Sequence, residues 1–245
     1  MLQPQSRRRS DQNTCRHSYG HDILAAVSFV AQSYRRNALR WLAVLLFLLA
    51  AIPCAAPARA GGGPLGIDHE WGLDQSGIWA QRDQNVLQYA VVAAELGGGI
   101  WFGRDDPLGH TFWQTVDSTA VSSISAEILK YAFSRERPRQ GGSPSKWFQG
   151  SCCDSFPSGE VTVQASFITP LIVNYAHEHP WIWSLEALPL YIGIARLKNQ
   201  AHWQSDVLAG WALGTGVGYW STLREVPLSV QFLPRGLTVG VTAHF

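Results

Sequence analysis

Five segments of the chain repeat apolar residues at intervals of three and four, and this periodicity is the strongest restriction on its fold. Such spacing places apolar side chains on one face of an α-helix. Pro170 interrupts the third segment and Pro189 the fourth. We therefore predict an all-α domain over residues 85–222. The predicted helices span 85–101, 111–133, 159–177, 181–196 and 203–221.

These helices are not predicted to span a membrane, because each contains polar side chains and none has about 18 uninterrupted apolar residues. The polar residues are Glu95, Asp117, Glu127, Gln164, Asn174 and Glu186. The interpretation we favour is a helical domain outside the membrane that contacts it through Trp residues, which prefer the membrane interface. A small multi-span protein is the alternative.

Residues 1–60 form a leader, of which residues 35–60 are the recognisable part. The apolar run 41–52 follows Arg35, Arg36 and Arg40 and precedes Ala58-Arg59-Ala60. A basic region, a short apolar run and small residues at the exit are typical of a signal peptide, here cleaved after Ala60. An uncleaved anchor helix is the alternative. Either one predicts export of the remaining chain to the periplasm or cell envelope, beginning with a Gly-rich and then polar extension, 61–84.

The distribution of charge argues against nucleic-acid binding. Residues 1–60 have a net charge of +6 and residues 61–245 a net charge of −5, so the basic excess belongs to the leader. A nucleic-acid binder would have a positively charged folded domain. After the leader only Cys152 and Cys153 remain, and they are adjacent. In an oxidising compartment they could form a vicinal disulfide or bond to another molecule; two free thiols are the alternative.

The last twenty residues, 226–245, have a different pattern. Residues 228–233 and 237–245 alternate apolar and polar side chains, and Pro234-Arg235-Gly236 lies between them. Alternation with an intervening turn predicts a β-hairpin tail.

Three clusters carry groups suited to an anionic ligand. In the first, Lys130 ends a helix and Arg137 follows in the loop, and both suit phosphate oxygens. In the second, Ser158 and Gly159 precede a helix whose free N–H groups favour an anion. Each cluster has a simpler interpretation when taken alone: a solvated basic helix end for the first, and an ordinary N-cap, with Glu160 in the first turn, for the second.

The third cluster contains Arg196, His202 and Asp206. His202 and Asp206 are four residues apart, which predicts that they share one face of a helix. A carboxylate in that position would orient the imidazole, whose other nitrogen would attack an electrophile. An isolated His–Asp pair at this spacing is more often structural.

Together the clusters read Lys130-x6-Arg137-Pro, Pro-Ser158-Gly159, and Arg196-x5-His202-x3-Asp206. This ordered set resembles the signature of the type 2 phosphatidic acid phosphatase superfamily, which includes bacterial acid phosphatases and vanadium haloperoxidases. The resemblance implies a compact bundle of about five to six helices with a phosphate pocket. It also implies that His202 is a nucleophile that becomes phosphorylated and that Asp206 orients it. Lys130, Arg137, Arg196, Ser158 and Gly159 would hold the phosphoryl oxygens, with no divalent metal and no cofactor.

The sequence departs from the family at Glu160, where the family has the His that protonates the leaving group. A carboxyl group near Lys and Arg stays ionised at neutral pH and donates a proton poorly. Three interpretations remain: Glu160 acts as an acid at low pH, the leaving group needs little protonation, as in a diphosphate, or the pocket binds phosphate without turnover. The departure counts against a vanadium peroxidase.

We therefore expect an extracytoplasmic hydrolase of a phosphate monoester or diphosphate, acting on a small molecule or a lipid. A phosphate-binding pseudoenzyme is the first alternative, a vanadium-dependent haloperoxidase the second, and an envelope structural protein the third. The sequence does not indicate an oligomeric state.

Overall fold

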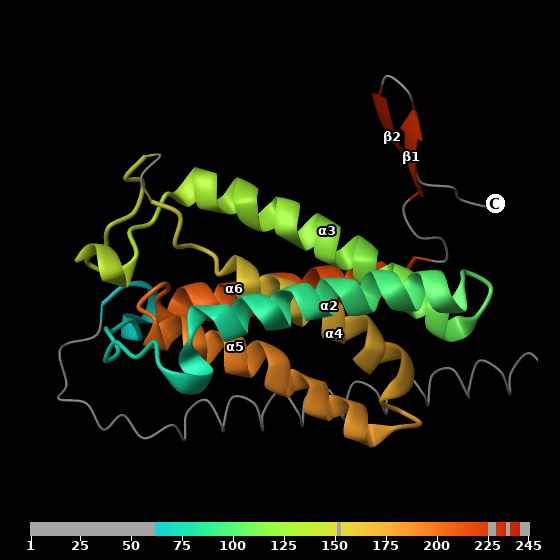
Figure 1. The fold of residues 1–245 in the computed structure, drawn as a ribbon. Coiled ribbons are helices and arrows are strands. Elements are labelled where there is room, and N and C mark those ends of the chain that lie inside the picture. Colours follow the sequence, from blue (N-terminus) through green and yellow to red (C-terminus); the bar gives the residue numbers. More distant parts are fainter. Residues whose placement is uncertain (1–61, 151–152, 225–228, 234–235, 241–245) are drawn as a thin grey trace, which may run out of the picture. The chain divides into compact units, whose positions relative to one another are not determined.

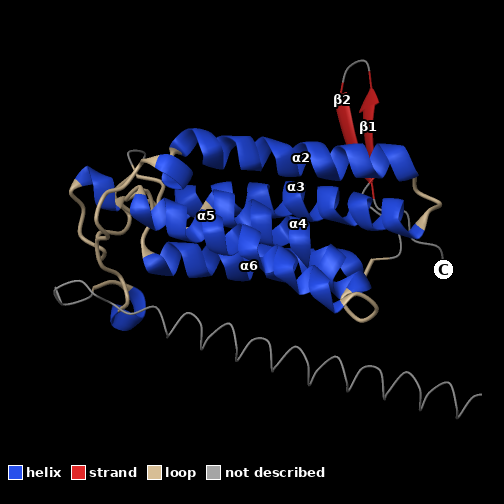
Figure 2. Cartoon of the chain, turned by 60° about the horizontal axis from the view of Figure 1, so that its bottom comes forward, coloured by secondary structure: helices blue, strands red, loops and turns tan. Residues whose placement is uncertain are grey.

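The computed structural model describes residues 62–150, 153–224, 229–233 and 236–240. In this part of the chain five α-helices lie side by side, roughly aligned (Figures 1 and 2), so the predicted helical fold is confirmed. The signal peptide, the leader and Cys152 fall outside the described residues. The helices are α2 (Gln81–Phe102), α3 (Pro107–Phe133), α4 (Gly159–Tyr175), α5 (Ala187–Lys198) and α6 (Gln204–Thr222). Short 3-10 helices are η1 (Pro64–Gly66), η2 (Gly77–Trp79), η3 (Pro138–Gln140) and η4 (Pro180–Glu186).

The start of α3 shows how local sequence sets a helix boundary. Asp106 accepts hydrogen bonds from the backbone N–H groups of Leu108 at 2.8 Å and Gly109 at 3.2 Å, and Pro107 takes the first helical position. A carboxylate cap followed by proline is a strong helix start. The fourth predicted helix is divided instead: residues 180–186 form η4, and α5 begins at Ala187, with Pro189 in its first turn.

Helix α4 is the centre of the bundle. Residues 161–170 are all buried, and Phe167, Ile168 and Ile172 form the apolar core with Val91 of α2. The buried stretch also contains Thr162, Ser166 and Thr169, whose hydroxyl groups donate to backbone carbonyls of the same helix or its N-cap. Pro170, which we predicted to interrupt this helix, lies within it. Proline lacks the N–H that would reach the carbonyl of Ser166, and the hydroxyl of Ser118 donates to that carbonyl instead, at 2.8 Å.

Helix α6 packs against α4 through glycines. A Cβ atom on Gly210 would lie 2.5 Å from the carbonyl oxygen of Ser158, and one on Gly214 would lie 2.3 Å from that of Thr162. Such distances exclude any side chain, so the two helix backbones approach each other closely. This contact holds the start of α6 against the start of α4, where two of the three motifs meet.

The interior between α2 and α3 contains an acidic side chain. Glu95 is 3% exposed and accepts a hydrogen bond from the hydroxyl of Thr119 at 3.0 Å. Burial raises the pKa of Glu95 to about 8 because it disfavours the charged carboxylate, and the hydrogen bond from Thr119 only partly offsets this effect. The carboxyl group is therefore mostly protonated at neutral pH.

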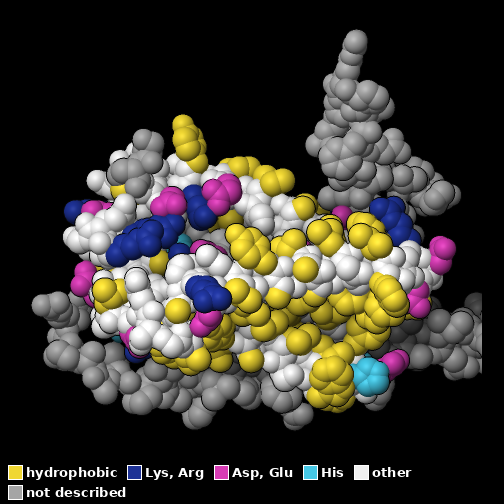
Figure 3. Space-filling view, viewed as in Figure 1, with side chains coloured by type: hydrophobic (Ala, Val, Ile, Leu, Met, Phe, Trp, Pro, Cys, Tyr) yellow, Lys and Arg dark blue, Asp and Glu magenta, His cyan; other side chains and the backbone are white. Residues whose placement is uncertain are grey.

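The surface combines a charged end with an apolar body. Figure 3 shows Lys, Arg, Asp and Glu side chains gathered where the α3–α4 loop lies, while apolar side chains cover much of the helices beyond it. In the described part of the chain, no helix combines the length and apolar character that crossing a membrane requires. The exposed large apolar residues include Tyr89, Ile100, Trp101, Ile124, Ile128 and Tyr131.

Two short strands, β1 (Ser229–Leu233) and β2 (Gly236–Gly240), pair antiparallel with Ser229 opposite Gly240. The turn and the end of the predicted hairpin, residues 234–235 and 241–245, lie outside the described residues, and the hairpin tail as a whole stays a prediction. Cys153 is disulfide-bonded, which contradicts two free thiols; its partner lies outside the described residues.

Candidate active site

The first turn of α4 brings two motifs together. Ser158 occupies the N-cap position, as predicted, but its hydroxyl makes no capping bond. Within the described residues this buried Oγ has no hydrogen-bond partner, so it is available to a ligand. A Cβ atom on Gly159 would come within 3.1 Å of Lys130 Nζ. Glycine therefore leaves room for the Lys130 ammonium group beside the helix start, where N–H groups already favour an anion.

Lys130 and Arg137 each have an acidic neighbour. Lys130, in the last turn of α3, forms an ion pair with Glu127 at 2.6 Å. Arg137 lies in the loop beyond and donates from Nε and Nη2 to the carboxylate of Asp154 at 2.7 and 2.9 Å. Burial raises the pKa of Asp154, but the hydrogen bonds and charge of Arg137 outweigh this and lower it below the usual range. An incoming phosphate would compete with Asp154 for Arg137.

His202 is not on a helix, and our prediction of a shared helix face with Asp206 is wrong. The ring lies in the turn between α5 and α6, because α6 begins only at Gln204. It is 1% exposed, and Nδ1 is 2.7 Å from the carbonyl oxygen of Ser155. A carbonyl only accepts, so Nδ1 carries the proton and Nε2 has the free lone pair. Within the described residues, Nε2 has no hydrogen-bond partner.

The electrostatic surroundings keep this imidazole neutral. Burial lowers the pKa of His202 most, because it disfavours the charged ring, and the positive charges of Arg196 and Arg137 lower it further, whereas Glu160 raises it. A neutral ring with a free Nε2 lone pair is the form that can attack an electrophile.

Asp206 acts on His202 indirectly. Its Oδ2 lies 4.0 Å from Nδ1, which is beyond hydrogen-bond range. The same oxygen accepts from the hydroxyl of Ser155 at 2.5 Å and from the backbone N–H of Trp203 at 2.9 Å. Asp206 therefore fixes Ser155 and the turn before α6, and the carbonyl of Ser155 holds the ring.

A buried ion cluster supports this turn. The guanidinium of Arg135 contacts the carboxylate of Asp206 and donates to Asp68 at 2.6 Å; all three side chains are 0% exposed. The guanidinium also stacks over Trp147, 4.3 Å from the ring centroid. Arg135 and Asp68 were not predicted as site residues. Arg135 belongs to the basic cluster that begins at Lys130, but the segment containing Asp68 gave no signal.

Arg196 holds the carboxylate of Glu160 beside the imidazole. Its Nη1 donates to the side chain of Gln81 at 2.8 Å, and its Nη2 is 3.1 Å from Glu160 Oε1. The other oxygen, Oε2, is 3.5 Å from His202 Nε2. Although burial raises the pKa of Glu160, its net shift is downward beside the Arg196 guanidinium, so this carboxyl stays ionised at neutral pH. An anion thus already occupies the space between the imidazole nitrogen and the guanidinium.

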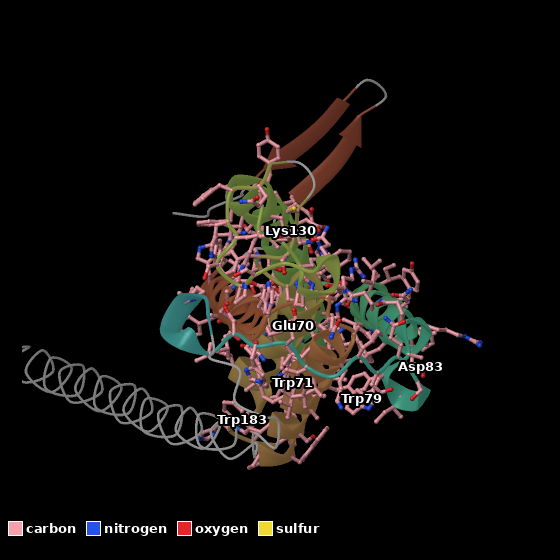
Figure 4. The ribbon with its side chains drawn as sticks, turned by 90° about the vertical axis from the view of Figure 1, so that its left-hand side faces the viewer. Glu70, Trp71, Trp79, Asp83, Lys130 and Trp183 are labelled. Carbon is pink, nitrogen blue, oxygen red and sulfur yellow. The ribbon has the colours of Figure 1, made fainter. Side chains whose placement is uncertain are left out.

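The motif residues therefore gather at one end of the bundle, although they come from α3, α4, α5, α6 and two loops. Figure 4 views this end, with Lys130 on α3 and Glu70 and Trp71 on the segment that crosses it before α2. An oxyanion in the place of the Glu160 carboxylate would meet the Arg196 guanidinium, the first turn of α4 and one imidazole nitrogen.

The residues of this site lie in a segment that is similar to a known protein family. Residues 112–226 match the model of the PAP2 superfamily and include all three motifs. The matched residues make up somewhat under half of the chain. The predicted family resemblance is confirmed.

Two curated relatives are similar to this chain over 59% and 51% of its length. The lipid A 1-phosphatase of Porphyromonas gingivalis is 29% identical over 152 residues, covering 59% of this chain and 32% of that protein. The undecaprenyl-diphosphatase of Sulfolobus acidocaldarius is 26% identical over 126 residues, covering 51% of this chain and 58% of that protein. This chain therefore spans about a third of the length of the lipid A 1-phosphatase and somewhat over half of the length of the undecaprenyl-diphosphatase. The crystal structure of Aquifex aeolicus LpxE aligns with a TM-score of 0.43 at 17% identity, over 56% of this chain and 82% of that one.

Proposed function

We propose that this PAP2 segment hydrolyses lipid-linked diphosphates outside the cytoplasm, through a phosphohistidine on His202. The leader sequence motivates the location. The lipid class is motivated by the names of two relatives, lipid A 1-phosphatase and undecaprenyl-diphosphatase. The preference for a diphosphate rests on one observation, the Glu160 carboxylate between Arg196 and His202 Nε2.

An ionised Glu160 restricts the leaving group. When an alkyl phosphate is cleaved, the departing alkoxide needs a proton from a general acid, and a carboxylate beside a guanidinium has none to give. A diphosphate releases a phosphate monoester, whose oxygen bears the negative charge without being protonated first. Substrate entry also requires the terminal phosphate to take the place of the Glu160 carboxylate on Arg196, and Glu160 is one third exposed and so has room to move aside.

The proposed reaction has two steps. In the first, His202 Nε2 attacks the terminal phosphorus, the bond to the bridging oxygen breaks, and that oxygen leaves with the electron pair as part of the lipid monophosphate. Lys130, Arg137, Arg196 and the Ser158 hydroxyl stabilise the charge on the phosphoryl oxygens. In the second, water attacks the phosphohistidine while Glu160 accepts its proton, and inorganic phosphate and free imidazole are released. An ionised carboxylate is suited to this second role.

The test compares an isoprenyl diphosphate with an isoprenyl monophosphate at pH 7, using the full chain. We expect the diphosphate to be hydrolysed at least ten times faster. Glu160→Gln, which cannot accept a proton, should slow turnover by about 100-fold or more and should accumulate acid-labile phosphohistidine. Glu160→His should raise monophosphate hydrolysis, because it restores a group that can donate a proton.

His202→Ala is the control, and it should yield no phosphoenzyme and no turnover. Equal rates on the two substrates would show that the carboxylate does not determine the leaving group, and full activity in Glu160→Gln would show that it does not accept the proton of the attacking water. Binding of the diphosphate without any phosphate release would favour the phosphate-binding pseudoenzyme instead.

A further inference from the structure

A cavity lies at the end of the bundle opposite the candidate active site. Its volume is about 400 Å³, and it is formed by the first turns of α3, the last turn of α4 and the end of α6. Because α4 runs from Ser158 to Tyr175 between the two sites, and a helix rises 1.5 Å per residue, they are roughly 25 Å apart. The lining residues are Pro107, His110, Thr111, Gln114, Asn174, Tyr175, Thr222, Leu223 and Arg224.

Arg224 is the residue of this cavity that most favours a bound anion. Its two terminal nitrogens, Nη1 and Nη2, are buried and have no hydrogen-bond partner among the described residues. The guanidinium stacks over Trp220, 4.8 Å from the ring centroid, which orients the cation but satisfies none of its N–H donors. A buried charge without a hydrogen-bonded partner is strongly unfavourable, and an oxyanion with two acceptor oxygens would satisfy the planar donor pair.

The cavity supplies no such anion itself. None of the nine described residues lining it is acidic, whereas Arg137 and Arg196 at the catalytic end each have a carboxylate partner. The opposite wall is polar and ordered. Asn174 Nδ2 donates to Thr111 Oγ1 and to Gln114 Oε1, both at 2.9 Å. Tyr175 adds a phenolic hydroxyl, 3.4 Å from Thr111 Oγ1, that can donate to a ligand oxygen.

We propose that this cavity is a second anion site that binds a phosphate group, with Arg224 as the principal contact and Tyr175 as a further donor. The shared chemistry is a phosphoryl oxyanion, supplied as free phosphate or as the phosphodiester of a lipid headgroup. We assign binding alone to this site, because Arg224 is the one Lys or Arg among the described residues that line it. The site is independent of the proposed function, since it contains none of the PAP2 motif residues.

Equilibrium dialysis of the full chain against labelled inorganic phosphate tests this by stoichiometry. We expect two sites per chain in the wild type and one in the Arg137→Gln/Arg196→Gln variant, which lacks the catalytic cradle. We expect none when Arg224→Gln is added to that variant. Arg104→Gln is the matched control, because Arg104 is exposed near the same end and stacks on Trp113 at 5.0 Å. It should leave both sites intact.

Arg224→Lys keeps the charge but loses the planar fork, so it should retain the second site with roughly ten-fold weaker binding. Soluble dihexanoyl phosphatidylglycerol, a phosphodiester, identifies the source: if it displaces phosphate from the site that depends on Arg224, the site accepts lipid headgroups, and otherwise it takes the free anion. Phosphate binding that is the same in a folded Arg224→Gln protein as in the wild type overturns the proposal, whereas a single wild-type site that Arg224→Gln removes supports it and counts against phosphate binding at the catalytic end. If the Arg137→Gln/Arg196→Gln variant loses catalysis and still binds phosphate at the site that depends on Arg224, the result supports the proposal.

Discussion

Replacing Arg135 with methionine should destabilise the fold more than any surface change. Arg135 lies between the carboxylates of Asp68 and Asp206, and none of the three side chains is exposed. It also donates to the carbonyl of Pro144 at 2.5 Å. Methionine fills much of the volume but leaves two buried carboxylates without a counter-ion. Removing one partner of a buried ion cluster costs about 3–5 kcal/mol, so we expect a loss of that size at pH 7.

Urea unfolding of the purified full chain, followed by circular dichroism, measures this loss. Arg139→Met is the matched control, because Arg139 is exposed in the same loop, and its effect should stay within about 0.5 kcal/mol. Adding Asp206→Asn to Arg135→Met removes one of the two uncompensated charges and should recover part of the loss. A loss below about 1 kcal/mol for Arg135→Met would refute the reasoning, since it would mean that the cluster does not hold the turn before α6.

Two further predictions concern the helix interior. Glu95→Gln should be more stable than the wild type at high pH. The folded wild type holds the Glu95 proton up to a pKa of about 8, whereas the unfolded chain loses it above about 4.5. The free energy of unfolding of the wild type therefore falls as the pH rises between these two values. Unfolding at pH 5 and pH 8 should show the advantage of the variant growing by up to about 4 kcal/mol, and an advantage that does not change with pH would contradict the assignment. Gly214→Ala should lower the melting temperature, with a cost of about 1–3 kcal/mol, because its Cβ would lie 2.3 Å from the carbonyl of Thr162. Gly216→Ala, on the same helix with open space around it, should be neutral or slightly stabilising, and equal effects of the two changes would argue against close α4–α6 packing.

Helix positions and motif chemistry could be predicted from the sequence because they depend on local patterns. Apolar periodicity predicted the five helices, although it placed the start of α3 at residue 111 and overlooked the cap at Asp106-Pro107. The departure at Glu160 was visible for the same reason, since a motif is read residue by residue. The predicted interruption at Pro170 is wrong. The hydroxyl that replaces the missing N–H of Pro170 belongs to Ser118, 52 positions earlier in the chain.

The sequence by itself determined which residue types this protein brings to an anion: three cations, an imidazole, a helix start, and a carboxylate in place of a second imidazole. Only the tertiary structure decided what each of them contacts. In the structure, His202 lies in a turn with Nδ1 against the carbonyl of Ser155, and Asp206 forms an ion pair with Arg135. These partners are dozens of residues apart in the chain, so no local pattern encodes them; they meet because α4 and α6 pack closely enough to bring their first turns together.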